Sequence, residues 1–139
     1  TAQQLMSCGV AGIDVAGTGG TSWAWIEAQR ANNQDFAQWF KDFGYPTDMA
    51  LKKMAALPHD VSIVASGGIR NPLDGLKAHL LGADYYSAAS PFLHAALESD
   101  ERIDDLLTRW QKGLAIGLFC MGVANWQKAA TCSLIDSQT

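Results

Sequence analysis

A predicted strand, a glycine turn and a helix follow one another in this chain and lead into a second strand, and this order limits the folds that it can adopt. Residues 61–65 form a short apolar run typical of a buried strand, and residues 66–68 (Ser-Gly-Gly) supply a turn after it. We expect a helix over residues 72–81 and another strand over residues 84–87. A unit of this kind is typical of a parallel α/β sheet with right-handed crossovers.

The helix expected over residues 72–81 carries signals at both of its ends. Asn71 can cap it, Pro72 suits its first position, and the charge of Asp74 suits the helix dipole. Gly82 can adopt the left-handed conformation that ends many helices. The face expected to pack inward contains Leu73, Leu76, Leu80 and Leu81.

The same order of elements occurs earlier in the chain. Residues 12–15 predict a strand, and residues 16–20 form a glycine-rich turn. Thr21 or Ser22 can cap the helix that follows. One stripe of that helix is expected to contain Trp23, Ile26 and Arg30.

Further helices are expected on either side of these units. One covers residues 2–6, with Gly9 after it, and because the first residues already lie in a helix we expect a fragment whose missing part lies upstream. Residues 1–139 are therefore expected to form one segment of a larger domain, with a frayed tail from about residue 133. One further helical segment is expected to carry Phe36, Trp39, Phe40 and Phe43, and the next is expected after Thr47 as N-cap, with apolar contacts from Met49, Leu51, Met54 and Leu57. A short helix is expected after Pro91, and more helix around Trp126. A long helix is expected from Asp100, and its inward face contains Ile103, Leu106, Leu107, Trp110 and Leu114.

Size and charge narrow the classes of function. The chain has 139 residues, whereas a closed eight-fold α/β barrel needs roughly 250. Its formal net charge of −4 argues against nucleic acid as a partner, because such binding depends on clustered Lys and Arg. The longest apolar run, residues 114–124, is too short to cross a membrane, and the first residues do not resemble a signal peptide. We therefore expect a cytoplasmic protein with no nucleic-acid or membrane partner.

The cysteines indicate neither disulfides nor a metal site. Cys8, Cys120 and Cys132 are odd in number and contain no C-x-x-C pair. We expect three buried thiols in a reducing compartment.

Three turns are expected to follow strands, and all consist of glycine or other small residues. They are residues 16–21, residues 66–70 and residues 88–90. Ligands of parallel α/β folds bind at the carboxyl ends of the strands, which is where these turns lie. Glycine lets backbone N–H groups approach a phosphate, and the start of the next helix adds a favourable dipole. The turns predict a phosphate site, although tight α/β connections also use glycine for geometry alone.

Few side chains near these turns point to a specific chemistry. Arg70 can add charge to a phosphate or simply lie on the surface near a helix start. Thr21 offers a hydroxyl to a ligand or an ordinary N-cap. Asp14 lies near the end of a strand, where we expect it to be the partner of a backbone or Lys group.

The remaining polar and aromatic residues do not converge on a catalytic site. His59, His79 and His94 are expected on the surface, and no Cys, Asp or Glu stands at metal-ligand spacing from them. No G-x-S-x-G motif supports acyl transfer. The tryptophans are spread over different helices, so we expect them to pack against barrel or subunit neighbours rather than to stack on nucleic acid. They are Trp23, Trp25, Trp39, Trp110 and Trp126.

A longer pattern joins these turns. It consists of residues 12–23 (GIDVAGTGGTSW), residues 44–47 (GYPT) and residues 65–71 (ASGGIRN), and it continues through residues 82–84 and residues 90–93. With this pattern the chain resembles the type 2 isopentenyl-diphosphate isomerases, a family of flavin-dependent (β/α)8 barrels. The resemblance covers most of the chain.

The resemblance implies an α/β fold that forms the C-terminal part, about the last three βα units, of a TIM (β/α)8 barrel. It implies an enzyme of isoprenoid biosynthesis that interconverts isopentenyl diphosphate and dimethylallyl diphosphate with reduced FMN and without net redox change. The family also uses Mg²⁺ and NADPH. The FMN-binding residues that it implies are Thr21, Gly67, Gly68, Ile69, Arg70, Ala89 and Ser90.

The chain departs from the family at several points. Ala16 stands where the family has a flavin-contacting Ser or Gly, and Ser90 stands where many members have Arg or Gly. The family's magnesium-binding Glu and basic substrate-binding residues belong upstream of Thr1. We therefore assign no catalytic or metal-binding residue and expect the segment to be inactive alone.

Open sheet edges are the expected consequence of a partial barrel. We expect the segment to pair with other copies as a homo-oligomer, to swap elements or to bend its sheet closed. We also expect it to bind FMN weakly, through the phosphate alone. One alternative is another FMN-dependent barrel oxidoreductase such as a 2-hydroxy-acid oxidase, although no His-Gly-Gly-Arg turn is present. Another alternative is a non-catalytic phosphate-binding half-barrel module.

Overall fold

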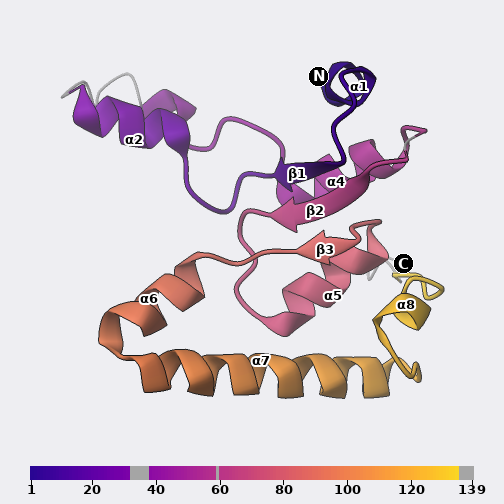
Figure 1. Ribbon diagram of the computed structural model, residues 1–139. Coiled ribbons are helices and arrows are strands. Elements are labelled where there is room, and N and C mark those ends of the chain that lie inside the picture. The colour runs from indigo at the N-terminus through magenta and orange to yellow at the C-terminus, as the bar shows by residue number, and fades with distance from the viewer. Residues whose placement is uncertain (32–37, 59, 135–139) are drawn as a thin grey trace.

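A single parallel sheet lies at the centre of the molecule. The computed structural model describes residues 1–31, 38–58 and 60–134. In Figure 1 the arrowheads of the strands point the same way, so their carboxyl ends share one edge of the sheet. The predicted parallel arrangement is confirmed. The strands, in sheet order, are β1 (Gly12–Ala16), β2 (Ser62–Ser66) and β3 (Tyr85–Tyr86).

Strand β3 is shorter than the predicted range of residues 84–87 because a side chain takes one position of the ladder. The Ile63 N–H donates to the Asp84 carboxylate at 2.8 Å rather than to a backbone carbonyl. On either side of β3, the N–H groups of Asp84 and Ser87 donate to the carbonyls of Ile63 and Ala65. The edge of β2 is therefore paired along its length although only two residues of β3 are regular strand.

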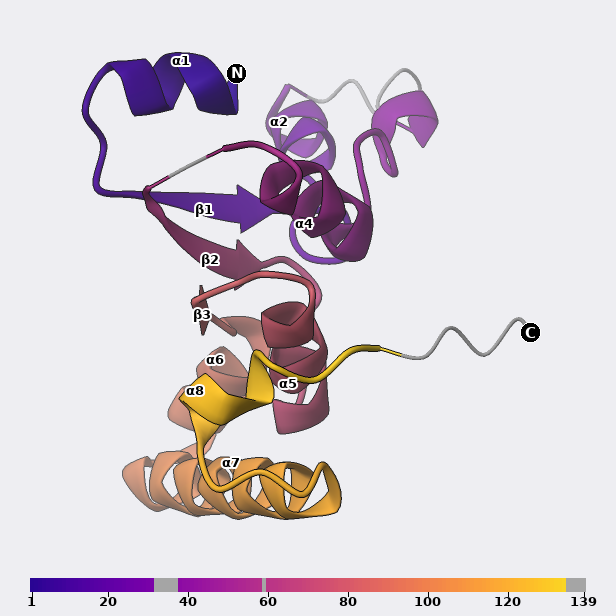
Figure 2. The ribbon, with the colours of Figure 1, turned by 90° about the vertical axis from the view of Figure 1, so that its right-hand side faces the viewer.

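Helices α4 and α5 pack on one side of the sheet, while α1 and α2 lie above it and α6, α7 and α8 below it in Figure 1. Helix α4 contacts β1 and β2, α5 contacts β2 and β3, and α7 lies across α5 and α6 (Figures 1 and 2). Helix α8 contacts α5 near the carboxyl end of α7. The helical elements are α1 (Ala2–Ser7), α2 (Trp23–Arg30), the 3-10 helix η1 (Gln38–Phe40), α4 (Thr47–Ala55), α5 (Pro72–Leu80), α6 (Ser90–Glu98), α7 (Asp100–Cys120) and α8 (Trp126–Ala129).

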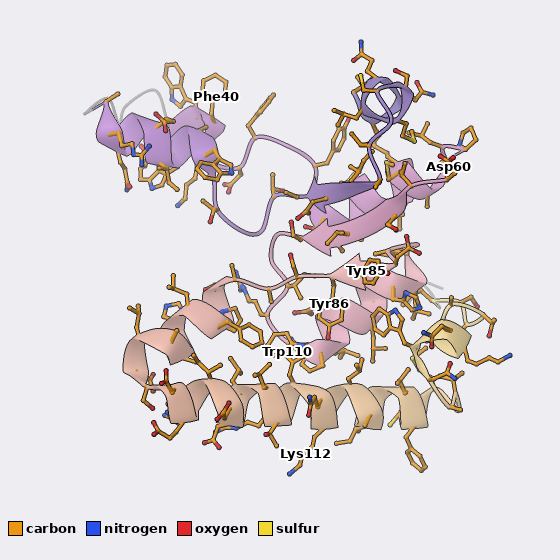
Figure 3. The ribbon with its side chains drawn as sticks, in the orientation of Figure 1. Phe40, Asp60, Tyr85, Tyr86, Trp110 and Lys112 are labelled. Carbon is orange, nitrogen blue, oxygen red and sulfur yellow. The ribbon has the colours of Figure 1, made fainter. Side chains whose placement is uncertain are left out.

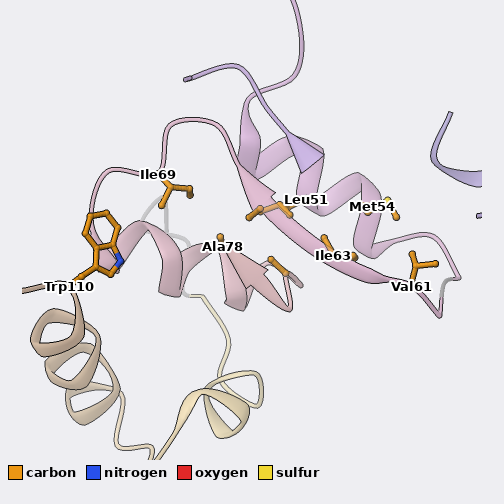
Figure 4. Close-up of a cluster of buried hydrophobic side chains, with 9 residues drawn as sticks. Leu51, Met54, Val61, Ile63, Ile69, Ala78 and Trp110 are labelled. Carbon is orange, nitrogen blue, oxygen red and sulfur yellow. The ribbon is translucent and has the colours of Figure 1, made fainter. Parts of the chain in front are cut away.

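The face of the sheet toward the helices carries the core. Ile63 and Ala65 of β2 are 1% and 0% exposed and belong to one cluster with Leu51 and Met54 of α4 (Figure 4). Trp110 of α7 closes the far end of the cluster. We call this side the covered face; its strand residues are Ile13, Val15, Ile63, Ala65 and Tyr86.

The opposite side of the same strands carries mostly polar or small residues and is more accessible to solvent. Because side chains alternate along a strand and paired residues of parallel strands share a side, its membership follows from the register. Tyr85 is 62% exposed, and it points away from Tyr86 and Trp110 in Figure 3. We call this side the open face; its residues are Gly12, Asp14, Ala16, Ser62, Val64, Ser66 and Tyr85.

Most of the predicted helix ends are confirmed. The Asn71 side chain accepts from the Asp74 N–H at 3.0 Å, and Gly82 has a φ of 102°. Ser22, one of the two candidates, caps α2 by accepting from the Trp25 N–H at 3.3 Å.

A side-chain cap also starts α7, where Ser99 accepts from the Arg102 N–H at 3.3 Å. A hydrogen bond from the Ser99 side chain, and to a smaller extent one from the backbone N–H of Glu101, lowers the pKa of the exposed Glu101 carboxyl.

Other expectations about the helices are wrong. Thr47 does not cap α4: Pro46 is the N-cap, and the Thr47 hydroxyl donates to a different segment. Leu73 is 56% exposed because the buried side of α5 is formed by Gly75, Leu76, Ala78 and His79. Leu107 of α7 is 43% exposed, whereas Trp110 is buried as predicted.

The described part of the aromatic segment around Trp39, residues 38–43, is not a regular α-helix. It contains the 3-10 helix η1, and Phe43 lies beyond it against Phe40, with ring centroids 5.9 Å apart. Phe36 lies outside the described residues. So do His59 and most of the tail predicted to fray.

His79 contradicts its predicted surface position. It is 9% exposed, and its two ring nitrogens lie 2.6 Å from the Ala83 carbonyl and 2.9 Å from the Trp126 carbonyl. The Trp126 ring stacks on it with a centroid distance of 4.0 Å. Helix α8 packs over this flank of α5, so a flank that looked free in the sequence is covered.

The cysteine prediction is wrong about burial. Cys8 and Cys120 are exposed and Cys132 is half-buried, and all three are free thiols. Cys8 is the C-cap residue of α1 and Cys120 is the last residue of α7, so both lie at an exposed helix end.

Candidate functional site

The turns that follow the three strands line one cavity at the carboxyl edge of the sheet. Its volume is about 540 Å³, within the range of roughly 300–1,000 Å³ typical of small-molecule sites. The turn after β1 supplies residues 16, 17 and 19–21, with Trp23 beyond it, and the turns after β2 and β3 supply residues 66–70 and residues 87–90. The cavity thus brings together every residue that the sequence nominated: Thr21, Gly67, Gly68, Ile69, Arg70, Ala89 and Ser90.

The first two turns pack against each other through their backbones. Gly67 has a φ of 86°, and a Cβ placed on it would collide with the Gly17 carbonyl oxygen. A Cβ on Gly68, whose φ is 79°, would lie 3.1 Å from the Gly19 oxygen. The close packing of the two turns therefore requires these glycines, in agreement with the alternative that such turns use glycine for their geometry. A phosphate-binding role has to come from their N–H groups.

A third segment fastens both turns from outside the cavity. The Thr18 N–H donates to the Tyr45 carbonyl at 2.8 Å. The Thr47 hydroxyl donates to the Gly67 carbonyl at 2.6 Å and lies 3.2 Å from that of Ser66. Residues 44–47 thus connect the turn after β1 to the turn after β2. We call them the Gly-Tyr-Pro-Thr segment.

Several backbone donors at the cavity are free. Within residues 60–134 no protein group accepts the N–H groups of Gly68, Ile69, Ala89 and Ser90. Helix α6 begins at this point with Ala89 as N-cap and without a side-chain cap. Unsatisfied donors at a helix start form an anion-binding arrangement.

Arg70 contributes differently from its neighbours. Its N–H donates to the Asp74 carboxylate at 3.0 Å, so its backbone donor is already used. Its side chain is exposed at the rim of the cavity and is the positive group that lines it. Thr21 is also exposed, and its hydroxyl is left to the cavity because Ser22 caps α2.

Asp14 has a partner that the sequence did not suggest. The Ser66 hydroxyl donates to the Asp14 carboxylate at 2.6 Å, which corrects the expectation of a backbone or Lys partner. The two side chains meet because Asp14 and Ser66 point to the same open face from adjacent strands. Ser66 lines the cavity and was missed as a site residue; a lone serine that ends an apolar strand was its only signal.

Neither described histidine lines the cavity, although His94 contacts Ser90, which does. His79 is enclosed between α5 and α8, and His94 Nδ1 lies 2.7 Å from the Ser90 carbonyl on α6. Among the residues that the structure describes, no three His, Cys, Asp or Glu side chains converge as a metal site would require. Nor is any helix of the described part both long and apolar enough to cross a membrane.

A parallel sheet whose successive turns line one cavity at the carboxyl edge is found both in (β/α)8 barrels and in doubly wound α/β folds. A crystal structure of mandelate oxidase with 2-hydroxy-phenylacetamide shares this fold with a TM-score of 0.71 at 18% sequence identity. The match covers 96% of this chain and 36% of that one. The predicted fold class is confirmed.

The chain belongs to the FMN-dependent dehydrogenase family, whose model matches residues 1–135. An isopentenyl-diphosphate delta-isomerase of Synechococcus sp. is 44% identical over 128 residues, which are 90% of this chain and 37% of that protein. The isomerase of Nostoc sp. is 42% identical over 89% of this chain and 36% of its own length, and that of Rickettsia bellii is 39% identical over 93% and 40%. The chain spans a little over a third of these relatives. The resemblance noted in the sequence is confirmed.

Proposed function

We propose that this chain forms the FMN phosphate site of an isopentenyl-diphosphate isomerase, which interconverts isopentenyl diphosphate and dimethylallyl diphosphate in isoprenoid biosynthesis. The observation that carries the proposal is that two turns with free N–H groups line one cavity beside the start of α6. The identity to curated isomerases selects this reaction among those of flavin barrels.

The residues present fit an FMN phosphate. Gly68 and Ile69 line the cavity from the turn after β2, and Ala89 and Ser90 line it from the turn after β3, so a phosphate bound there would receive donors from both turns. Arg70 adds a positive charge at the rim, and the dipole of α6 favours an anion at its start. When bound, the reduced flavin ring supplies the chemistry for adding and removing a proton.

Other residues of the cavity would contact the rest of the cofactor. Ser66 presents only acceptor lone pairs to the cavity, because its one proton is given to Asp14. Thr21 supplies a hydroxyl and Trp23 a large apolar surface from the turn after β1. The chain would thus bind and orient the cofactor, while proton-transferring groups would come from elsewhere in the protein.

The rest of the proposal concerns the whole protein. An isoprenoid diphosphate substrate, Mg²⁺ and NADPH follow from the isomerase assignment, and the described residues contain no metal cluster of their own. A homo-oligomer is supported by the edge positions of β1 and β3 in the sheet. Three free thiols suit a reducing compartment such as the cytoplasm.

A second candidate is an FMN-dependent barrel oxidoreductase. The match to the FMN-dependent dehydrogenase family and the shared fold with mandelate oxidase favour it. The two candidates predict different products: an isomerase returns an isomer of its substrate with no net oxidation, whereas an oxidoreductase consumes one equivalent of oxidant per turnover.

Binding measurements test the phosphate site. We expect the full chain to bind FMN about tenfold more tightly than riboflavin, and inorganic phosphate to compete with FMN. Equal affinity for FMN and riboflavin would refute the phosphate site. Phosphate binding without any preference for FMN would instead support a non-catalytic phosphate-binding module.

Assays of the whole protein with isopentenyl diphosphate, FMN, reductant and Mg²⁺ then test the reaction. Formation of dimethylallyl diphosphate supports the isomerase. Substrate oxidation without isomerisation would support the oxidoreductase.

A further inference from the structure

We propose that Thr47 is a positioning residue for the ligand phosphate: its hydroxyl fixes the peptide between Gly67 and Gly68 so that the Gly68 N–H points into the cavity. The inference rests on the proposed FMN phosphate site. It concerns a residue that does not line the cavity and that the sequence suggested only as a helix cap.

The contact itself is short and joins distant parts of the chain. Thr47 Oγ1 lies 2.6 Å from the Gly67 carbonyl oxygen, against 3.2 Å from that of Ser66, so Gly67 is its main acceptor. The side chain is half-buried at the first residue of α4. A hydroxyl has one proton to donate, and here it is committed to the glycine turn.

The Gly67 carbonyl and the Gly68 N–H belong to the same peptide unit. This unit is planar and trans, so its C=O and N–H point in opposite directions. Holding the carbonyl toward Thr47 therefore turns the N–H to the other side. Thr47 lies outside the cavity and Gly68 lines it, so the other side is the ligand's side.

This peptide needs a restraint because glycine flanks it on both sides. Gly67 and Gly68 have φ values of 86° and 79°, and glycine populates positive and negative φ about equally readily. Rotation of the peptide between them would point a carbonyl, rather than an N–H, at an anion. The Thr47 hydrogen bond selects the orientation that binds the anion.

Thr47 is itself held in place without help from a ligand. The Gly-Tyr-Pro-Thr segment is bridged to the turn after β1 between Thr18 and Pro46, and the Ala50 N–H closes the first turn of α4 on the Pro46 carbonyl at 2.9 Å. A Cβ on Gly17 would collide with the Thr47 backbone, which shows how closely the two segments lie. The hydroxyl is thus positioned before any phosphate arrives.

A purely structural role would leave ligand preference unchanged, so the test compares two ligands. FMN and riboflavin differ only in the phosphate, and the ratio of their dissociation constants is independent of the fraction of protein that is folded. Thr47→Val removes the hydroxyl at nearly constant shape, and Thr47→Ser restores a donor. Thr131→Val is the matched control, because Thr131 also donates to a carbonyl, that of Lys128 at 2.8 Å, on a surface away from the cavity.

We expect the preference of the full chain for FMN over riboflavin to fall about fivefold to tenfold in T47V, while riboflavin affinity changes less than about twofold. T47S and T131V should keep the wild-type preference within about twofold. A wild-type preference in T47V, or an equal loss for both ligands, overturns the positioning role. If T47V does not fold, Thr47→Cys, which has only a weak donor, is judged by the same criterion.

The same data separate this inference from the proposed function. If wild-type protein does not prefer FMN over riboflavin, the phosphate site itself is refuted. If the wild type shows the preference and T47V keeps it, the phosphate site stands and only the role of Thr47 is wrong.

Discussion

The covered face and the open face of the sheet are built from alternating residues of the same strands, yet they differ in composition and burial. In β2 the residues toward the helices, Ile63 and Ala65, are 1% and 0% exposed. Their neighbours Ser62, Val64 and Ser66 are only half-buried. On β3 the contrast is carried by two tyrosines: Tyr86 meets Trp110 through a hydrogen bond of 2.9 Å, whereas Tyr85 faces away (Figure 3).

Stability and ligand binding therefore depend on different faces of the sheet. The covered face removes apolar surface from water, which is the main favourable term in folding. The open face carries the polar Asp14–Ser66 pair and ends at the cavity. Substitutions on the covered face should therefore change the free energy of unfolding, and substitutions on the open face should mainly change ligand binding.

The largest effect is expected from a core truncation on the covered face. Ile63→Ala should lower the free energy of unfolding by about 3 kcal/mol, because the methyl groups removed leave a cavity between β2 and α4. Val64→Ala, on the open face of the same strand, should cost about 1 kcal/mol or less. Urea unfolding of both variants measures the difference. Similar losses in the two variants would contradict the division between the faces.

A second substitution tests the carboxyl edge, where the faces meet the turns. Gly67→Ala should cost about 2–3 kcal/mol, because a positive φ and a collision with Gly17 act together. Gly9→Ala has a similar φ of 80° but nothing within 4 Å of the new Cβ, so it should cost about 1 kcal/mol. Thermal unfolding compares the two variants. A cost for Gly67→Ala no greater than that for Gly9→Ala would show that the two turns separate easily.

The helix layer behind the covered face can be tested at His79. His79→Ala should destabilise the protein by about 2 kcal/mol, because two carbonyl contacts and the stacked Trp126 ring are lost together. His94→Ala, at an exposed position on α6, should cost about 0.5 kcal/mol. Chemical denaturation followed by tryptophan fluorescence reports both variants. Equal effects would mean that α8 does not hold this side of α5.

The smallest stability effect is expected on the open face itself. Asp14→Ala should change the free energy of unfolding by about 0.5 kcal/mol, because the hydrogen bond to Ser66 lies at an exposed site. It should alter flavin binding more clearly, since the Ser66 hydroxyl becomes free to donate. A double-mutant cycle with Ser66→Ala checks the coupling. In the Ser66→Ala background, removal of Asp14 should have no further effect on riboflavin affinity.

The sequence was sufficient to predict what depends on local patterns. The strands at β1 and β2, the Asn71 cap of α5 and the left-handed Gly82 follow from residues that are adjacent in the chain. The convergence of the glycine turns was also predictable, because parallel strands bring their carboxyl ends to one edge.

What the sequence did not reveal depends on contacts between segments far apart. Threonine is a common N-cap residue, so the sequence suggested that Thr47 caps a helix. Its hydroxyl instead donates to the Gly67 carbonyl, which the turn after β2 brings close to it. His79 looked exposed because α8, which covers it, lies more than forty residues further along the chain. Asp14 and Ser66 are separated by 52 positions and meet only through the register of β1 and β2.

The close backbone contact between Gly17 and Gly67 limits how this part of the protein can evolve. The atoms that touch belong to the main chain, so there is no side chain whose gradual replacement could widen or tighten the junction. The spacing of the two turns can therefore change only through residues that pack behind them, such as Thr47, which lies against Gly17.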